Sequence, residues 1–366
     1  MSEAYIIYTF LLLFMIGSTW MYSLSSKRYQ KYIMAIIVIV YSLILGLRYN
    51  VGVDYLAYKE IFMHQDFSDV EIGYALVNKF LYVLGFSYPA IFILVAFGQI
   101  YFFLKGVEAF DKKILPFVVF FYFTTLYLFL SLNVLRQTLA FSIFVFSLRY
   151  IQQKNLFKYL ITILFAFIFH RSAIILFPLY FIANIDYLLR HRRLQLVLYF
   201  STFLFSVFFS DFLWNNFATL AQLLGYSDYA DSVSVAAEIE WGGGGGLGLY
   251  MWMIIDLWVI LCYNKYRYAR NSQYDIVVYN LYFIGLLLAN VVAGSYFDRV
   301  NIYFQHIRII VYAIFFYRLF ILNNKAVEKI MAFAIFIVLL IFFYMGINNR
   351  ASLCAPFNFV FTNYVY

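Results

Sequence analysis

Long apolar runs, interrupted by short polar segments, constrain this chain more than any other sequence feature. A membrane-spanning helix needs about 20 predominantly apolar residues, within a range of about 17–25. Twelve runs of this kind or slightly shorter occur, at 4–23, 32–47, 88–104, 114–131, 133–150, 157–170, 172–185, 194–209, 248–264, 276–293, 300–320 and 328–346. We therefore expect an all-α polytopic membrane protein with about 12 transmembrane helices in a single membrane domain, 1–366.

Composition supports the same class. Hydrophobic residues make up 65% of the chain and charged residues 12%, whereas soluble domains have about 45–50% and about 25%. A core of this size cannot hide so much apolar surface from water, so the remainder must face lipid. The first run has no basic region before it, which favours a retained helix over a cleaved signal peptide.

Three segments depart from the regular pattern. The runs 157–170 and 172–185 are short, which predicts thin or tilted helices that meet at an interruption. The segment 73–86 is apolar but too brief to cross a bilayer. We expect it to form an interfacial or re-entrant helix in the first external loop, 48–87.

Basic residues in short loops predict the orientation of the chain. They fall in alternate loops, which should be cytoplasmic: Lys27, Arg28 and Lys31; Lys105, Lys112 and Lys113; Arg149, Lys154 and Lys158; Arg190, Arg192 and Arg193; Lys265, Arg267 and Arg270; Lys325 and Lys329. This distribution accounts for the net charge of +8 without a nucleic-acid partner. The opposite face then carries 48–87, 210–247 and the C-terminal tail.

The loop 210–247 is acidic and contains no Lys or Arg. It ends in five glycines, 242–246, and glycine disfavours a helix. The loop is either a plain flexible connection or one that folds over the surface as a gate. Cys262 and Cys354 form no metal or redox motif, and we expect neither a metal nor a cofactor.

Several basic residues lie at or just below the predicted outer face, against the inside-positive trend: Arg48, Arg136, His170, Arg171, Arg299, His306 and Arg308. An ionisable group at membrane depth costs about 2.5–3.5 kcal/mol on insertion scales, so each is a functional candidate.

Each of these basic residues also has a structural alternative. As the alternative, Arg48 simply snorkels from the end of the second apolar run, and Arg136 forms a satisfied internal pair. His170 and Arg171 would otherwise cap a short helix. Arg299 has Asp298 beside it, and His306 and Arg308 have a structural role as their alternative.

Together these residues predict a cationic pocket beneath one membrane face. A guanidinium donates parallel hydrogen bonds to phosphate oxygens and keeps its charge, so the cluster favours a phosphate or pyrophosphate ligand. Asp54 and Glu71 lie on the same side and are candidate bases.

Short motifs along most of the chain resemble those of one known family. They are "LRYNVGVDYLAY" at 47–58, "EIGYALVNKFLYVLG" at 71–85, "NVLRQTLAF" at 133–141, "FHRSAIILFPLY" at 169–180, "FDRVNIYF" at 297–304 and "CAPFNFVF" at 354–361. In this order they resemble the EpsG-like family of the Wzy polysaccharide polymerases.

The resemblance implies a glycosyltransferase of the bacterial inner (cytoplasmic) membrane with a GT-C-like architecture and its active site facing the periplasm. Such a polymerase transfers a growing glycan from undecaprenyl pyrophosphate to the non-reducing-end sugar of an incoming lipid-linked repeat unit. The product would be an O-antigen of lipopolysaccharide, a capsule or an exopolysaccharide. A chain-length regulator is a further candidate partner.

The resemblance also implies roles for individual residues. Four arginines would bind the pyrophosphate: Arg48, Arg136, Arg171 and Arg299. The general base would be His170 or Asp54, with Glu71 as third choice. Supporting residues would be Tyr55, Asn133, Gln137, His306 and Arg308. No DxD motif is present, which favours a metal-independent reaction.

Two other functions stay open from the sequence. An O-antigen ligase, or another lipid-linked glycosyltransferase, would use the same chemistry, but a ligase needs a larger external loop than 210–247. A flippase or exporter of the lipid-linked unit would carry charge along a two-sided path, often within internal repeats. No such repeat is visible in the sequence.

Overall fold

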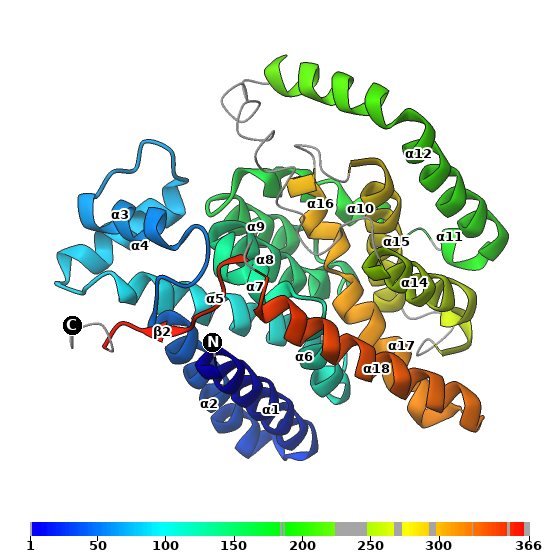
Figure 1. The fold of residues 1–366 in the computed structure, drawn as a ribbon, viewed down its shortest axis with the longest axis horizontal. Coiled ribbons are helices and arrows are strands. Elements are labelled where there is room, and N and C mark those ends of the chain that lie inside the picture. The colour runs from blue at the N-terminus through cyan, green and yellow to red at the C-terminus, as the bar shows by residue number, and fades with distance from the viewer. Residues whose placement is uncertain are drawn as a thin grey trace. The chain divides into compact units, whose positions relative to one another are not determined.

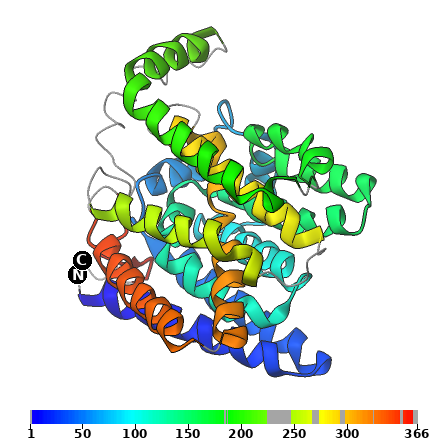
Figure 2. The same cartoon turned by 90° about the vertical axis from the view of Figure 1, so that its right-hand side faces the viewer.

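A computed structural model of the protein describes residues 2–183, 185, 187–223, 247–266, 273–292, 298–323, 325–349 and 352–361. The chain divides into two compact units (Figures 1 and 2). The first unit comprises Met1–Tyr180 together with Asn323–Tyr366, and the second comprises Phe181–Leu322. Each unit is described by itself.

The first unit is built from helices and one pair of very short strands. Its elements are α1 (Ser2–Leu24), α2 (Lys27–Gly46), β1 (Arg48–Tyr49), α3 (Tyr55–His64), α4 (Ile72–Val83), α5 (Pro89–Glu108), the 3-10 helix η1 (Lys112–Ile114), α6 (Leu115–Thr124), α7 (Tyr127–Asn133), α8 (Leu135–Gln152), α9 (Leu156–Phe167), the 3-10 helix η2 (Arg171–Leu176), α10 (Leu179–Ile182, whose end belongs to the second unit), α18 (Ala326–Ile347) and β2 (Asn358–Phe359).

The core of the first unit is a set of long helices packed side by side. Helix α2 packs against α1 and α5, α5 against α8, and α8 against α9, and Figures 1 and 2 both show α1 and α2 as neighbours. Gly106 allows α5 and α8 to approach closely, because a Cβ there would lie 2.7 Å from the Val145 backbone. Small residues at helix crossings are typical of membrane bundles.

The prediction of an all-α polytopic membrane protein is confirmed. Among the described residues, 6 helices are long and apolar enough to cross a membrane: Glu3–Leu24, Lys27–Gly46, Pro89–Glu108, Gln273–Val291, Val300–Leu322 and Ala326–Ile347. The pair Lys112–Thr124 and Tyr127–Asn133, bent by 65°, raises this number to 7 if it forms one span.

The expected number of twelve transmembrane helices is not confirmed. The run 114–131 is bent at Leu126, which has a left-handed backbone (φ 61°). The run 157–170 yields a helix of only 12 residues, Leu156–Phe167. The run 172–185 begins as a 3-10 helix, a tight form that seldom extends far. The bend at Leu126 leaves no signal in hydropathy because Leu126 is itself apolar, whereas the interruption at His170 and Arg171 agrees with the expectation for the two short runs.

The loop 48–87 is held in place by a segment close to the C-terminus. Strands β1 and β2 pair antiparallel, with Arg48 opposite Phe359. Beyond the strands, Val360 N donates to Leu47 O at 2.9 Å and Gly52 N donates to Leu353 O at 2.8 Å. The C-terminal segment 352–361 therefore closes over the start of the loop 48–87, in a contact that the sequence did not predict.

The predicted short helix of this loop is present as α4, with 12 residues. At 1.5 Å per residue it is about 18 Å long, too short for a hydrocarbon core of about 30 Å. Its exposed apolar residues include Ile72, Leu76 and Phe80, which follow one another at helical spacing. Its location at a membrane interface stays a prediction.

Among its described residues, the second unit contains five further helices and the short α11. They are α11 (Tyr187–Arg190), α12 (Arg192–Leu223), α14 (Leu247–Tyr266), α15 (Gln273–Val292), α16 (Asp298–Gln305) and α17 (Arg308–Leu322). Helix α15 packs against α12 and α16, and α14 packs against α17. Helix α12 continues through a kink at Phe209, so the first part of the expected loop 210–247 is helical. Residues 224–246 lie outside the described residues.

Candidate functional site

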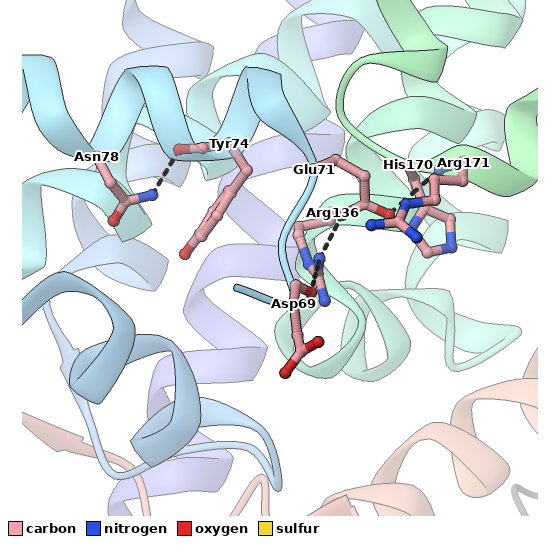
Figure 3. A network of polar contacts seen from close by, with 7 residues as sticks. All are labelled: Asp69, Glu71, Tyr74, Asn78, Arg136, His170 and Arg171. Carbon is pink, nitrogen blue, oxygen red and sulfur yellow. Dashed lines mark hydrogen bonds and ion pairs between the residues drawn. The ribbon is translucent and has the colours of Figure 1, made fainter. Parts of the chain in front are cut away.

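Glu71 lies at the centre of a cluster of charged side chains in the first unit. One carboxylate oxygen, Oε1, lies 2.9 Å from His170 Nδ1 and accepts a hydrogen bond from the Arg171 backbone N at 3.2 Å. The other oxygen, Oε2, forms an ion pair with Arg136 Nη1. Figure 3 shows Arg136, His170 and Arg171 gathered around this carboxylate.

The position of Glu71 follows from the start of α4. Glu71 precedes the helix with an extended backbone (φ −68°, ψ 148°). Two residues later, Gly73 N donates to Ile168 O at 2.8 Å, and a Cβ at Gly73 would lie only 2.8 Å from that oxygen. Because only glycine leaves room for this contact, the beginning of α4 is fixed against the chain that follows α9.

His170 lies in the break between α9 and η2. Helix α9 ends at Phe167, and His170 has an extended backbone (φ −156°, ψ 121°) just before η2 begins. Its side chain makes no capping hydrogen bond to η2. The imidazole contacts Glu71 instead, so the alternative that His170 merely caps a short helix does not describe its contacts.

Arg136 is the second residue of α8 and has an internal partner, as its structural alternative anticipated. Besides the ion pair with Glu71, its Nη1 donates to Asp69 O at 3.4 Å. Its Cζ lies 6.0 Å from the ring centroids of both Tyr58 and Tyr74, at the limit of cation–π range. The side chain is 22% exposed, so the pair does not enclose it completely.

The electrostatics of the cluster favour an ionised carboxylate. Burial alone would raise the pKa of Glu71, but the hydrogen bond with His170 and the charge of Arg136 together lower that pKa to about 2. Arg136 and the exposed Arg171 then contribute two positive charges against one negative charge. The cluster therefore keeps a net positive charge when His170 is neutral.

Arg48 is positioned differently from Arg136. It is 1% exposed, and its guanidinium donates to three backbone carbonyls: Val51 O at 3.0 Å, Leu45 O at 2.6 Å and Leu132 O at 3.0 Å. Phe92 lies against it, with 4.8 Å from Cζ to the ring centroid. Its contacts thus join α2, the loop 48–87 and α7, and its role in binding pyrophosphate stays a prediction.

The other predicted residues of this unit have mostly internal contacts. Tyr55 is buried and stacks on Phe92 at 4.7 Å. Asn133 accepts a hydrogen bond from Val53 N and donates to Phe129 O at 2.9 Å. Gln137 Nε2 donates to Ser172 Oγ at 3.4 Å, next to the Glu71 cluster. Asp54 directly precedes α3 and is partly exposed.

Three predicted residues belong to the second unit. The side chain of Arg299 lies outside the described side chains. Arg308 Nη2 lies 3.7 Å from Asp256 Oδ2, and its Cζ lies 5.3 Å from the Trp252 ring centroid. His306 is at the end of α16. These contacts agree with the structural alternative for Arg308. The pyrophosphate-binding role of Arg299 and the supporting roles of His306 and Arg308 stay predictions.

Sequence reasoning missed some contributors to the site. Asp69 provides a backbone carbonyl for Arg136, and Tyr58 and Tyr74 provide flanking rings. Tyr74 closes the "EIGY" motif, so the motif itself was the available signal. Among the described residues, no group of three or more His, Cys, Asp or Glu side chains is placed to hold a metal ion. Metal independence stays a prediction.

The Glu71 cluster unites three motifs that are far apart in the sequence, and all three lie within a region that matches one known family. A sequence model of the EpsG family matches residues 31–364. The chain belongs to the EpsG family. This confirms the resemblance seen in the sequence, over almost the whole chain.

EpsG-family proteins are Wzy-like polymerases, and membership places this protein in the class of transmembrane polysaccharide polymerases. The matched region of this EpsG-family protein contains the whole Glu71 cluster. No curated protein and no solved structure matches the chain.

Proposed function

We propose that this EpsG-family protein transfers a growing glycan from undecaprenyl pyrophosphate to the non-reducing-end sugar of a lipid-linked repeat unit. The reaction takes place at the periplasmic face of the bacterial inner membrane, where the predicted topology puts the loop 48–87. Both substrates are lipid-linked, which accounts for an active site built into a membrane protein. The product is a surface polysaccharide.

The single observation that carries the proposal is the convergence on Glu71. Its carboxylate contacts Arg136 and His170, which lie 65 and 99 residues further along the chain (136 − 71 and 170 − 71). A cation suited to phosphate and an imidazole suited to proton transfer are thereby held beside one another. These are the two functions that a glycosyl transfer from a diphosphate requires.

In this reaction the acceptor hydroxyl oxygen attacks the anomeric carbon of the donor glycan. The bond between that carbon and the pyrophosphate oxygen breaks, and its electron pair leaves with the lipid diphosphate. The hydroxyl proton passes to His170, which acts as the general base. The products are the lengthened lipid-linked glycan and undecaprenyl pyrophosphate, and the proton is released when His170 returns to its neutral form.

Arg136 and Arg171 stabilise the negative charge that develops on the departing diphosphate. Arg136 remains 22% exposed beside Glu71, and the Arg171 side chain is exposed. Positive groups placed in advance where charge develops are worth about 10²–10³-fold in rate for each one removed. Arg48 is left out of this group because backbone carbonyls occupy its guanidinium.

Glu71 is a poor candidate for the general base. A pKa of about 2 makes its carboxylate a weak proton acceptor, and both oxygens already receive hydrogen bonds or pair with cations. His170 is therefore preferred. Asp54 is the alternative base from the sequence analysis, and Asp54→Asn serves as the comparison variant in the same assay.

The decisive experiment is chain elongation by the purified protein with lipid-linked repeat unit as the sole substrate. The wild type should produce a ladder of longer lipid-linked chains, in the presence or absence of a chelator. Arg136→Ala should lower the elongation rate by at least about 100-fold, and His170→Gln by a similar factor. Arg28→Ala, at an exposed site on the opposite predicted face, is the control.

The same assay separates the other functions. A normal ladder from both Arg136→Ala and His170→Gln would overturn the proposed site. Transfer of finished chains only to a different acceptor lipid would indicate a ligase. In cells, loss of a polymerase should leave surface lipid with a single repeat unit, whereas loss of a flippase should trap that unit in the cytoplasmic leaflet.

A further inference from the structure

We infer that Glu71 is a positioning residue that holds His170 through Nδ1 and so makes Nε2 the nitrogen that accepts the proton. This inference rests on the proposed function, in which His170 is the general base. It gives Glu71 a part in the reaction that is neither proton transfer nor substrate binding. It also specifies that the Nε2 edge of the imidazole ring faces the acceptor hydroxyl.

The short distance to a carboxylate argues for one tautomer, although His170 Nδ1 is buried and makes no hydrogen bond of good geometry in this structure. Glu71 Oε1 lies 2.9 Å from His170 Nδ1. An ionised carboxylate accepts hydrogen bonds but cannot donate them, so the nitrogen that faces it carries the proton. A neutral imidazole then has its lone pair on Nε2, and Nε2 alone is able to act as a base.

Glu71 is itself held from several sides, as a positioning residue must be. Arg171 N donates to the same Oε1 at 3.2 Å, and Arg136 pairs with Oε2. The backbone contact between Gly73 and Ile168 fixes the start of α4. The Glu71 side chain is only 9% exposed, so these contacts are partly shielded from water, and the low pKa of its carboxyl keeps it ionised at neutral pH.

The chain contains a second Glu–His pair that is not buried and is therefore a control for the Glu71–His170 pair. Glu60 Oε2 and His64 Nε2 lie 2.8 Å apart on α3, with side chains 57% and 73% exposed. An exposed ion pair of this kind contributes little to the free energy of unfolding. The two pairs have the same chemistry and nearly the same length, and they differ in burial and in the motifs around them. Glu60→Gln and His64→Gln therefore control for the substitution itself.

A double-mutant cycle on the elongation rate tests the inference. Glu71→Gln alone should lower kcat by at least about 10-fold, less than the roughly 10²–10⁴-fold value of a general base. In a His170→Gln background, Glu71→Gln should change kcat by less than about twofold, because its effect acts through the imidazole. Glu71 also pairs with Arg136, whose charge acts in the same step, so a second cycle with Arg136→Ala in place of His170→Gln measures any part of the Glu71 effect that passes through that arginine.

The outcomes distinguish the inference from the proposed function. Absence of elongation by the wild type would overturn the proposed function, whereas wild-type elongation by His170→Gln would overturn only the assignment of the base, and the present inference with it. A different result would overturn only the positioning role. In that case His170→Gln lowers kcat strongly, but Glu71→Gln lowers kcat by the same factor in the wild type and in the His170→Gln background. The Glu60→Gln and His64→Gln cycle should show no loss of elongation in any variant.

A spectroscopic readout covers the case in which Glu71→Gln folds poorly. The chain has 4 histidines, so ¹⁵N-histidine labelling gives a simple spectrum in which His170→Gln assigns the relevant signals. The wild type at a pH where His170 is neutral should show the tautomer protonated at Nδ1. A His170 signal from the tautomer protonated at Nε2 would overturn the inference without any activity measurement.

Discussion

Gly73 N donates a hydrogen bond to Ile168 O at 2.8 Å, and this bond joins the "EIGY" motif to the "FHRSA" motif. Gly73 lies two residues after Glu71, and Ile168 lies two residues before His170. The backbone contact and the side-chain contact therefore run in parallel between the same two segments. The distance between Glu71 and His170 depends on how closely those segments approach.

Gly73→Ala should impair catalysis while the protein still folds. An added Cβ would lie 2.8 Å from Ile168 O, so the start of α4 must move, at a cost of about 1–3 kcal/mol for overpacking. A displacement of about 1 Å at a reacting group can lower a rate by about 100-fold. The elongation assay should show at least a 10-fold loss.

Gly17→Ala is the control for this substitution, because a Cβ at Gly17 has no atom within 4 Å. It should leave both elongation and Tm unchanged. Normal elongation by Gly73→Ala would show that the close approach of α4 to Ile168 is not required for the site.

Arg48→Ala should act on stability rather than on chemistry alone. The substitution leaves three buried carbonyls without their donor, and each such loss costs on the order of 1–3 kcal/mol. We expect a large drop in the Tm of the detergent-purified protein, and a similar drop for Arg48→Lys, which cannot reproduce the planar fork. Arg28→Ala should keep the wild-type Tm. A stable but inactive Arg48→Ala protein would instead favour the original prediction that Arg48 binds pyrophosphate.

The contribution of Glu71 to the stability of the folded protein should change with pH only under acidic conditions. Its folded-state pKa of about 2 is below the ordinary 4.5, so folding stabilises the ionised form. That stabilisation is present above the ordinary pKa and is lost as pH falls through the folded value. The Tm difference between wild type and Glu71→Gln should be constant from about pH 8 to pH 5 and shrink below about pH 4.5.

Glu60→Gln, in the exposed pair, should show only a small Tm difference at every pH in the same series. A Glu71→Gln difference that already shrinks between pH 8 and pH 6 would mean that the carboxyl is not held in its ionised form by His170 and Arg136.

The predicted topology can be tested with single cysteines. Ser68 is exposed in the loop 48–87, and Lys154 is exposed at the turn after α8. With Cys262 and Cys354 replaced by serine, Ser68→Cys should react with a membrane-impermeant thiol reagent added from outside the inner membrane. Lys154→Cys should react only after the cells are lysed. The reverse pattern would place the Glu71 cluster on the cytoplasmic side.

Some features of this protein were predictable because they depend on neighbouring residues. Apolar runs identified α1, α2, α5 and α18 as long helices, since a lipid-facing helix must be apolar along its whole length. The brevity of 73–86 identified α4. The break at the left-handed Leu126 was not predictable, because an apolar residue leaves no distinctive local composition, whereas the polar His170 and Arg171 marked the break between α9 and η2.

The sequence by itself determined that the protein is a helical membrane protein of the EpsG family, and it singled out Glu71, Arg136 and His170 as exceptions to an apolar pattern. Tertiary structure alone decided their contacts. It directed Arg48 to backbone carbonyls and turned Glu71 from a candidate base into a partner of Arg136 and His170. The physical reason is that the protonation and the free face of an ionisable group depend on which groups fold against it, and those groups come from distant segments of the chain.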